Sequence, residues 1–211
     1  MTVMEGFREH IPGYSYGAAD VPASPVSILE LEELKIGAGF TEEDERYLRL
    51  AGAALEDQTS EIVNHWRSEI IASIPHLARH SRTPEGDPIP EYLAKSNLRF
   101  EQWILDTCFR PYDRDWLNYQ HEIALRHTSA KKNKTDAVRS TPCVPFRDIL
   151  AFIPIMNETI LPRLAAKGHS SDEIEKMHRA WCKSVQMQMA LWTAAYMDSP
   201  PAAPSNTTSE L

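Results

Sequence analysis

The chain has few of the residues that build disulfide or zinc sites. Its three cysteines, Cys108, Cys143 and Cys182, are odd in number, lie far apart and form no CxxC pair or Cys/His cluster. Neither a disulfide framework nor a zinc site is therefore indicated, and we expect reduced thiols in a cytoplasmic protein.

The sequence also lacks a segment suited to a membrane. No run of about 18 apolar residues occurs, which is the length that a spanning helix needs. The first ten residues carry Glu5, Arg8 and Glu9 and have no apolar core, so they do not resemble a signal peptide. We expect a protein that neither spans nor contacts a membrane.

A surplus of positive charge is missing as well. The chain has 22 Lys and Arg against 30 Asp and Glu, which gives a formal net charge of -8 at pH 7. Binding to a phosphate backbone requires basic residues that displace counterions, so nucleic acid is not an expected partner. A G-x-G-x-x-G fingerprint for a built-in flavin or nicotinamide cofactor is also absent from the sequence.

What the chain does contain is a succession of amphipathic helical patterns. Its 211 residues, 42% hydrophobic and 25% charged, have the composition of one globular domain. Apolar residues recur at three- and four-residue spacing, and no useful stretch alternates with the period of a strand. The expected helices run over about 27–36, 42–55, 59–74, 90–108, 113–127, 146–167 and 171–196. We predict an all-α fold of about eight helices joined by short loops.

Local signals define several helix ends. Capping boxes at Ser27–Glu30, Thr41–Asp44 and Ser170–Glu173 predict the starts of three helices. Pro154 and Pro162 interrupt the long pattern that precedes the last helix, because an internal proline removes a backbone hydrogen bond and commonly kinks the helix.

The two ends of the chain differ from the domain at 26–197. Residues 1–25 form an arm rich in Pro and Gly, and its composition favours a flexible leader that carries Tyr14 and Tyr16. Residues 198–211 are rich in Pro, Ser and Thr and are predicted to be a disordered tail.

One histidine is placed where it could bind a metal. Asp113 is positioned to cap the helix over 113–127. Trp116, Gln120, Ile123, Ala124 and His127 then share one largely apolar face. An imidazole at the inner end of such a helix could be an axial ligand to haem iron. From spacing alone, a hydrogen-bonded core or rim histidine is the commoner outcome.

Several ordered segments together resemble the protoglobins, single-domain relatives of the haem domain in globin-coupled sensors. The resemblance extends from about Ile11 to about Tyr196. It is carried by Ile11–Gly17, Arg99–Thr107, Trp116–Gln120, Ile123–His127, Lys131–Asp136, Ala151–Ile153 and Lys167–Met177.

This resemblance implies a globin-like helical sandwich with an extra N-terminal arm and a pre-A helix. It implies haem b as cofactor, with His127 as the proximal iron ligand and the arm, with Tyr14 and Tyr16, folded over the haem edge. On the opposite face of the haem it places Trp66, the residue after it, Phe100, Phe152 and Ile155.

The sequence departs from the family pattern at two points. Arg67 stands where the resemblance implies a tyrosine, and the interval from Trp66 to Pro75 is one residue longer. Arg67 either offers N–H donors to a ligand or propionate or points to solvent, and its charge favours solvent. An aromatic residue before Pro154 is also missing, which affects the lining expected around Ile155.

The function that follows from the resemblance is reversible binding of O2, CO or NO, as a carrier, scavenger or single-domain gas sensor. A homodimer through the last two long helices is also implied. The alternative is a haem enzyme, an NO dioxygenase or a peroxidase-like protein, which would depend on a separate reductase. A third possibility is a helical interaction domain without a cofactor, and enzymatic function is the less expected outcome.

Overall fold

The computed structural model describes residues 11–197, and the predicted disordered tail lies outside the described residues. Eight α-helices account for most of this part. They are α2 (Ile28–Gly37), α3 (Glu42–Leu55), α4 (Thr59–Asn64), α5 (Pro75–Ala78), α6 (Pro90–Phe109), α7 (Arg114–Leu125), α8 (Phe146–Ala165) and α9 (Ser171–Met197). The one pairing of strand type found between residues 11 and 197 is an isolated bridge from Arg82 to Pro88. The predicted all-α fold is confirmed.

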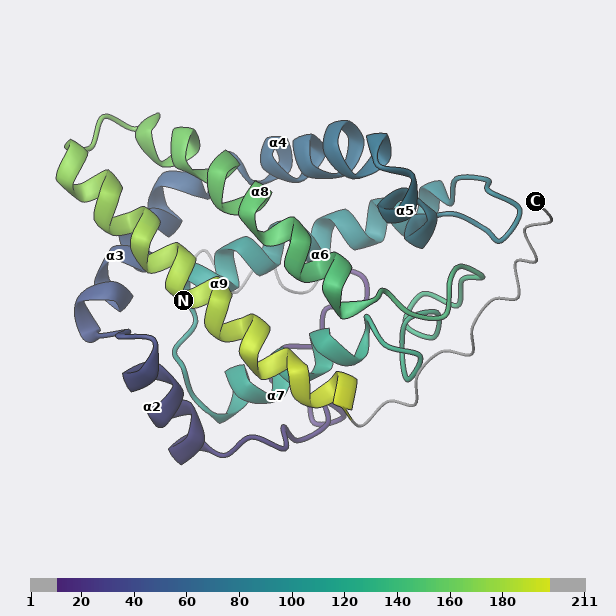
Figure 1. Ribbon diagram of the computed structural model, residues 1–211, viewed down its shortest axis with the longest axis horizontal. Coiled ribbons are helices and arrows are strands. Elements are labelled where there is room, and N and C mark those ends of the chain that lie inside the picture. Colours follow the sequence, from purple (N-terminus) through teal and green to yellow (C-terminus); the bar gives the residue numbers. More distant parts are fainter. Residues whose placement is uncertain (1–10, 198–211) are drawn as a thin grey trace, which may run out of the picture.

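The helices form two crossing layers around α9. This helix packs against α3, α7 and α8, and α6 packs against both α3 and α4. Figure 1 shows α8 and α9 side by side in front of α6 and α7. Because each amphipathic helix covers the apolar stripe of a neighbour, the arrangement is the predicted helical sandwich.

Tryptophans fill much of the core and are paired with buried amides. Trp103 donates its indole N–H to Gln188 Oε1 at 2.7 Å, and Trp192 donates to Gln120 Oε1 at 3.0 Å. Both glutamines are themselves buried. Burying an indole adds a large apolar surface to the core, but its N–H must keep a partner to avoid a desolvation cost. The glutamines on α7 and α9 supply that partner.

The predicted helix starts are present. Ser27 Oγ accepts from the Glu30 N–H at 3.2 Å while Glu30 Oε2 accepts from the Ser27 N–H at 2.7 Å. Asp113 Oδ1 accepts from the Trp116 N–H at 2.9 Å, which satisfies a free donor of the first turn of α7.

The predicted helix at 59–74 is not a uniform α-helix. After α4 the chain forms a π-helical turn, η2 (His65–Ile70), and then a 3-10 turn, η3 (Ile71–Ser73). The π-helical turn lies in the interval from Trp66 to Pro75, for which the resemblance predicts one additional residue. A π-helical turn takes more residues than an α-helical one, so it is suited to accommodate such an insertion.

The long helix expected at 146–167 is present, and both internal prolines lie within it. Helix α8 continues from Phe146 to Ala165 through Pro154 and Pro162. Its buried face, which includes Ile153 and Ile160, packs into the core. Tertiary packing of this face therefore keeps the helix continuous in spite of the lost backbone hydrogen bonds.

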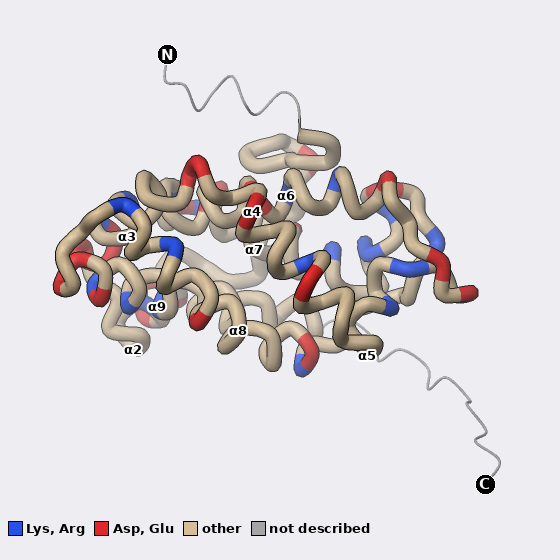
Figure 2. Tube along the Cα trace, turned by 90° about the horizontal axis from the view of Figure 1, so that it is seen from above, with Lys and Arg blue, Asp and Glu red and all other residues tan. Residues whose placement is uncertain are grey.

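The surface carries both signs of charge. Acidic and basic residues are interspersed along the described trace, as Figure 2 shows. Among the helices of residues 11–197, none combines the length and the apolar content required to cross a membrane.

The packing at Gly52 leads to a first prediction. A Cβ at this position of α3 would lie 2.5 Å from Phe109 Cζ and 2.8 Å from Cys108 Cβ. Gly52→Ala should therefore lower the free energy of unfolding by about 1–3 kcal/mol, although alanine is the better helix former. Urea unfolding of the variant measures the change.

Gly37 is the matched control, because a Cβ there meets nothing within 4 Å. Gly37→Ala should leave stability unchanged or raise it by up to about 1 kcal/mol. Equal effects of the two substitutions would contradict the close approach of α3 to α6.

Candidate functional site

A cavity of about 230 Å³ lies between α6, α7, α8 and the connection that follows α7. One water needs only about 10–15 Å³ in the same kind of measure, so the space suits a much larger group. Its apolar lining comprises Ile71, Leu77, Phe100, Trp103, Ile123, Val144, Ile149, Phe152, Ile153, Met156, Met189 and Trp192. Its charged lining comprises Arg67, Arg99, Arg126, Lys132, Asp136 and Asp148.

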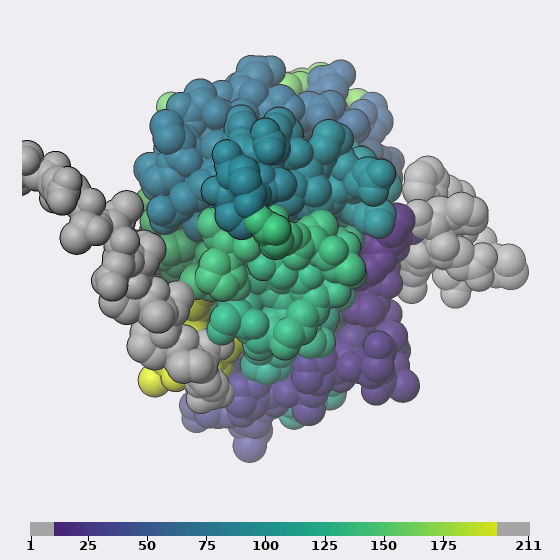
Figure 3. Space-filling model, turned by 90° about the vertical axis from the view of Figure 1, so that its right-hand side faces the viewer, coloured from purple at the N-terminus to yellow at the C-terminus, as the bar shows by residue number. Residues whose placement is uncertain are grey.

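Three segments that are distant in the sequence meet at the end of the molecule that holds the cavity. Residues 75–90, the connection at 126–145 and the arm at 11–25 lie side by side in Figure 3. The connection after α7 corresponds to the gap between the helices expected at 113–127 and 146–167. Only the folded chain brings these segments to one place.

His127 lies just beyond the end of α7 and lines the cavity. Its Nδ1 is 2.8 Å from the carbonyl oxygen of Ile123, and its ring lies 5.1 Å from the Trp192 ring at an interplanar angle of 31°. A carbonyl oxygen only accepts hydrogen bonds, so Nδ1 carries the proton and Nε2 keeps its lone pair. The hydrogen bond thus orients the ring and leaves Nε2 as its basic nitrogen.

The protonation state of His127 follows from its surroundings. Its pKa is lowered to about 4, chiefly by burial. The positive charges of Arg67, Lys132 and Arg126 also lower the pKa, whereas the hydrogen bond to Ile123 raises it. The imidazole is therefore neutral at pH 7. A neutral imidazole is the form that binds a metal ion.

The residues predicted for the opposite face of the cofactor divide into two groups. Phe100, Phe152 and Arg67 line the cavity. Trp66 and Ile155 are not among the lining residues: Trp66 is fully buried behind Phe100, with ring centroids 5.2 Å apart, and Ile155 packs against the core.

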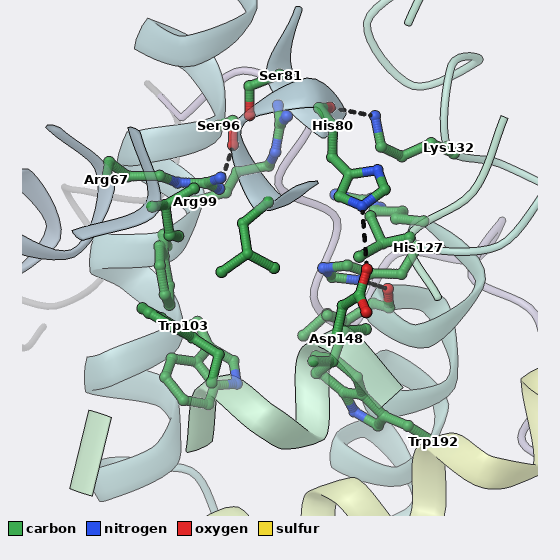
Figure 4. A pocket seen from close by; sticks show the side chains of 18 of the residues that line it. Arg67, His80, Ser81, Ser96, Arg99, Trp103, His127, Lys132, Asp148 and Trp192 are labelled. Atoms are coloured by element: carbon green, nitrogen blue, oxygen red, sulfur yellow. Dashed lines mark hydrogen bonds and ion pairs between the residues drawn. The ribbon is translucent and has the colours of Figure 1, made fainter. Parts of the chain in front are cut away.

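Arg67 faces the cavity, so the solvent orientation that its charge favours is wrong. Its Nη2 donates to Ser96 Oγ at 2.9 Å, and its Cζ lies 5.2 Å from the centroid of the Phe100 ring. Burial lowers the pKa of the guanidinium from its ordinary value. Figure 4 shows Arg67 and His127 on opposite sides of the cavity.

The arm is anchored by the tyrosines that the sequence singled out, although neither lines the cavity. The Tyr14 hydroxyl donates to Asp106 Oδ2 at 2.8 Å and accepts from Arg110 Nη2 at 2.9 Å. Tyr14 and Tyr16 both pack edge-on against Tyr119, at 5.3 and 5.4 Å between ring centroids. Tyr119 in turn lines the cavity. Figure 2 shows the arm along the outside of α6.

Two arginines connect the arm to the cavity. Arg99 donates to the Pro12 carbonyl at 2.6 Å, and Arg126 donates to the Gly13 carbonyl at 2.7 Å. Both side chains also line the cavity. The arm therefore covers the side of the cavity that is formed by Arg99 and Arg126.

Sequence reasoning missed a polar group on the same cavity. His80 is buried and lines the cavity with Asp148; its Nε2 lies 3.5 Å from Asp148 Oδ2. Lys132 donates to the His80 carbonyl at 2.9 Å. These residues are far apart along the chain and follow no periodic pattern, so no signal in the sequence would have grouped them.

The protoglobin family model matches residues 29–200 of the chain. The chain belongs to the protoglobin family. None of the curated proteins compared with it matches. This protoglobin is thus a member of a family whose proteins are globins that generally bind haem.

The residues of the cavity fit a haem. His127 presents a neutral imidazole nitrogen, and a largely apolar lining suits a planar macrocycle. Arg67 Nε, on the cavity lining, is buried without a hydrogen-bond partner among the described residues. Buried polar atoms in this state indicate a group that belongs there.

The two arm tyrosines make a matched pair of substitutions. Tyr14→Phe removes both polar contacts of its hydroxyl and leaves Asp106 and Arg110 less satisfied, so the free energy of unfolding should fall by about 1–3 kcal/mol. Tyr16→Phe should have no destabilising effect, because the Tyr16 hydroxyl is buried without a partner. Urea unfolding of both variants measures the difference, and equal losses would contradict the anchoring role of Tyr14.

The pKa of His127 makes the stability of the haem-free protein depend on pH. The folded state protonates this ring only near pH 4, whereas the ordinary pKa is 6.5, so the unfolded state holds more protons between these values. The free energy of unfolding should therefore fall as the pH falls through this window, by about 2 kcal/mol between pH 7 and pH 5. Burial also lowers the pKa of His80, so protonation of His80 should reduce the free energy of unfolding further as the pH falls.

Urea unfolding of the haem-free protein at the two pH values tests this, with His127→Gln as the control. The variant should lose distinctly less stability on acidification. The same loss in both proteins would show that His127 does not titrate as its burial requires.

Proposed function

We propose that this protoglobin binds haem b through His127 and takes O2, CO or NO reversibly at the iron. The supporting observation is the geometry of His127: Nδ1–H is held by the Ile123 carbonyl, while the ring lines a cavity of about 230 Å³. Family membership supports the same cofactor. The role as carrier, scavenger or single-domain gas sensor is part of this proposal.

Each part of the cavity would contribute to gas binding. Haem b supplies an iron centre that accepts diatomic ligands. Phe100 and Phe152 exclude water from the space, which protects a reduced metal from oxidation. Arg99 and Arg126, on the side covered by the arm, are suited to hold the two carboxylates of haem through charge-assisted hydrogen bonds.

The division of the chain is also proposed: an arm at 1–25 that closes over the haem edge, a globin domain at 26–197 and a tail at 198–211. Anchoring of residues 12–14 by Arg99, Arg126 and Asp106 supports closure by the arm. Residues 1–10 and 198–211 lie outside the described part. The predicted cytoplasmic location remains a prediction.

A homodimer through α8 and α9 belongs to the same proposal. Leu150 and Leu161 on α8 are large apolar side chains that are each 39% exposed. An apolar hollow between the two helices is lined in part by Leu161, Pro162 and Ile174. A second copy that covers this face would remove it from water.

A haem enzyme is the second candidate. His80, a buried imidazole beside Asp148, lines the same cavity and is suited to accept a proton in NO dioxygenation or peroxidase-like chemistry. Sustained turnover with a separate reductase or electron donor would favour this function over reversible binding.

Haem titration tests the role of His127. The wild-type protein should form a one-to-one complex with a five-coordinate ferrous spectrum and a strong shift on addition of CO. His127→Ala should lose this spectrum because the cavity then lacks a neutral nitrogen ligand, and free imidazole should restore it by filling the space left by the side chain.

His76→Ala serves as the control, because His76 is exposed and does not line the cavity. Its spectra should match those of the wild type. If His127→Ala keeps the wild-type spectra without imidazole, another group holds the cofactor and the proposal is wrong.

A further inference from the structure

We propose that this cavity is selective for small monovalent anions, such as azide or nitrite, and that Arg67 is the residue that selects them. The inference rests on the proposed binding of haem and adds a class of ligand beyond the neutral diatomic gases.

The first argument is the missing counter-ion. Arg99 pairs with Asp136 at 2.6 Å, and Arg126 pairs with Glu122 at 2.8 Å. Within residues 11–197, no carboxylate lies within 4.0 Å of the Arg67 guanidinium, whose one hydrogen-bond partner is the neutral hydroxyl of Ser96. A buried charge without a partner is costly, so an anion that reaches it is stabilised.

The second argument is the free donor of this side chain. Arg67 Nε is buried and makes no hydrogen bond among the described residues. The guanidinium lies over the Phe100 ring, 5.2 Å from its centroid, which offsets part of the cost of burial through the ring electrons. The contacts with Ser96 and Phe100 leave the Nε–H of Arg67 unused. An anion in the cavity can accept a hydrogen bond from this group.

The third argument is the place of Arg67 relative to His127. The two side chains lie on opposite sides of the cavity in Figure 4, and both line it. A ligand held opposite His127 therefore lies in the field of Arg67. Because a guanidinium stays protonated through the ordinary pH range, this field is permanent, unlike the dipole of a tyrosine hydroxyl.

The other charged groups of the cavity do not cancel this field. Asp136 is paired with Arg99, and Asp148 lies beside His80 and 4.0 Å from Arg79. Lys132, on the far side, lies 2.9 Å from a backbone carbonyl and has no acidic partner within 4.0 Å in the described part of the chain. The uncompensated charge in the cavity is thus positive, which favours anions.

The local backbone explains why a charged side chain enters this space. Trp66 and Arg67 are neighbours in the π-helical turn η2; Trp66 is buried in the core and donates to Thr159 Oγ1 at 2.7 Å. With the indole fixed in this way, the next side chain is directed to the cavity, where Ser96 and Phe100 of α6 hold it.

Equilibrium titration of the ferric, haem-loaded protein with sodium azide tests the inference. Arg67→Met removes the charge with little change in length, and it should weaken azide binding by roughly tenfold to a hundredfold. The azide affinity of Arg67→Lys should lie between those of Arg67→Met and the wild type. Lysine keeps the positive charge but lacks the planar, multiple N–H donors of the guanidinium. Affinity of the ferrous form for CO, a neutral ligand, should change by less than about threefold.

A second readout needs no haem. Arg67→Met should raise the melting temperature of the haem-free protein, since it removes an unpaired buried charge. Arg46→Met, at a side chain that is 65% exposed, is the control for a simple change in net charge and should alter neither melting temperature nor azide affinity.

The outcomes separate the two proposals. If the wild type fails to bind haem, both the proposed function and this inference are overturned. If haem and CO bind normally but Arg67→Met binds azide as tightly as the wild type, the anion inference is wrong and the proposed function stands.

Discussion

The hydrogen bond between His127 and the Ile123 carbonyl is the contact on which the site depends. Helix α7 ends at Leu125, so the Ile123 carbonyl is one of the last carbonyls without a partner in the helix. The histidine side chain satisfies that carbonyl and is itself held in one tautomer. A single interaction therefore satisfies a carbonyl at the end of the helix and orients the ligand of the proposed cofactor, and Trp192 packs against the ring.

Around this contact the cavity combines an apolar wall with four basic side chains that have different roles. Arg99 and Arg126 each have a carboxylate partner and also hold the carbonyls of the arm. Arg67 and Lys132 have no acidic partner among the described residues. The paired arginines close one edge of the cavity, and the unpaired cations set the potential inside it.

Helix continuity shows how packing overrides local preference. Internal prolines disfavour a helix, yet α8 is continuous because its apolar face is buried against α9. At η2 the reverse holds, since a sequence with a regular apolar pattern adopts a π-helical turn between α4 and η3. The wider turn keeps Trp66 in the core and places Arg67 at the cavity.

The sequence by itself determined the features that depend on near neighbours. Helix starts follow from side chains three residues apart, as at Ser27 and Asp113, and the apolar period predicted that His127 faces the interior. Ordered segments along the chain were enough to predict the family and the all-α fold. Only the tertiary structure decided that Arg67 enters the cavity and that His80 meets Asp148, because these contacts join residues from separate elements. Such placements depend on how whole helices pack, and a period or a spacing within one segment carries no information about them.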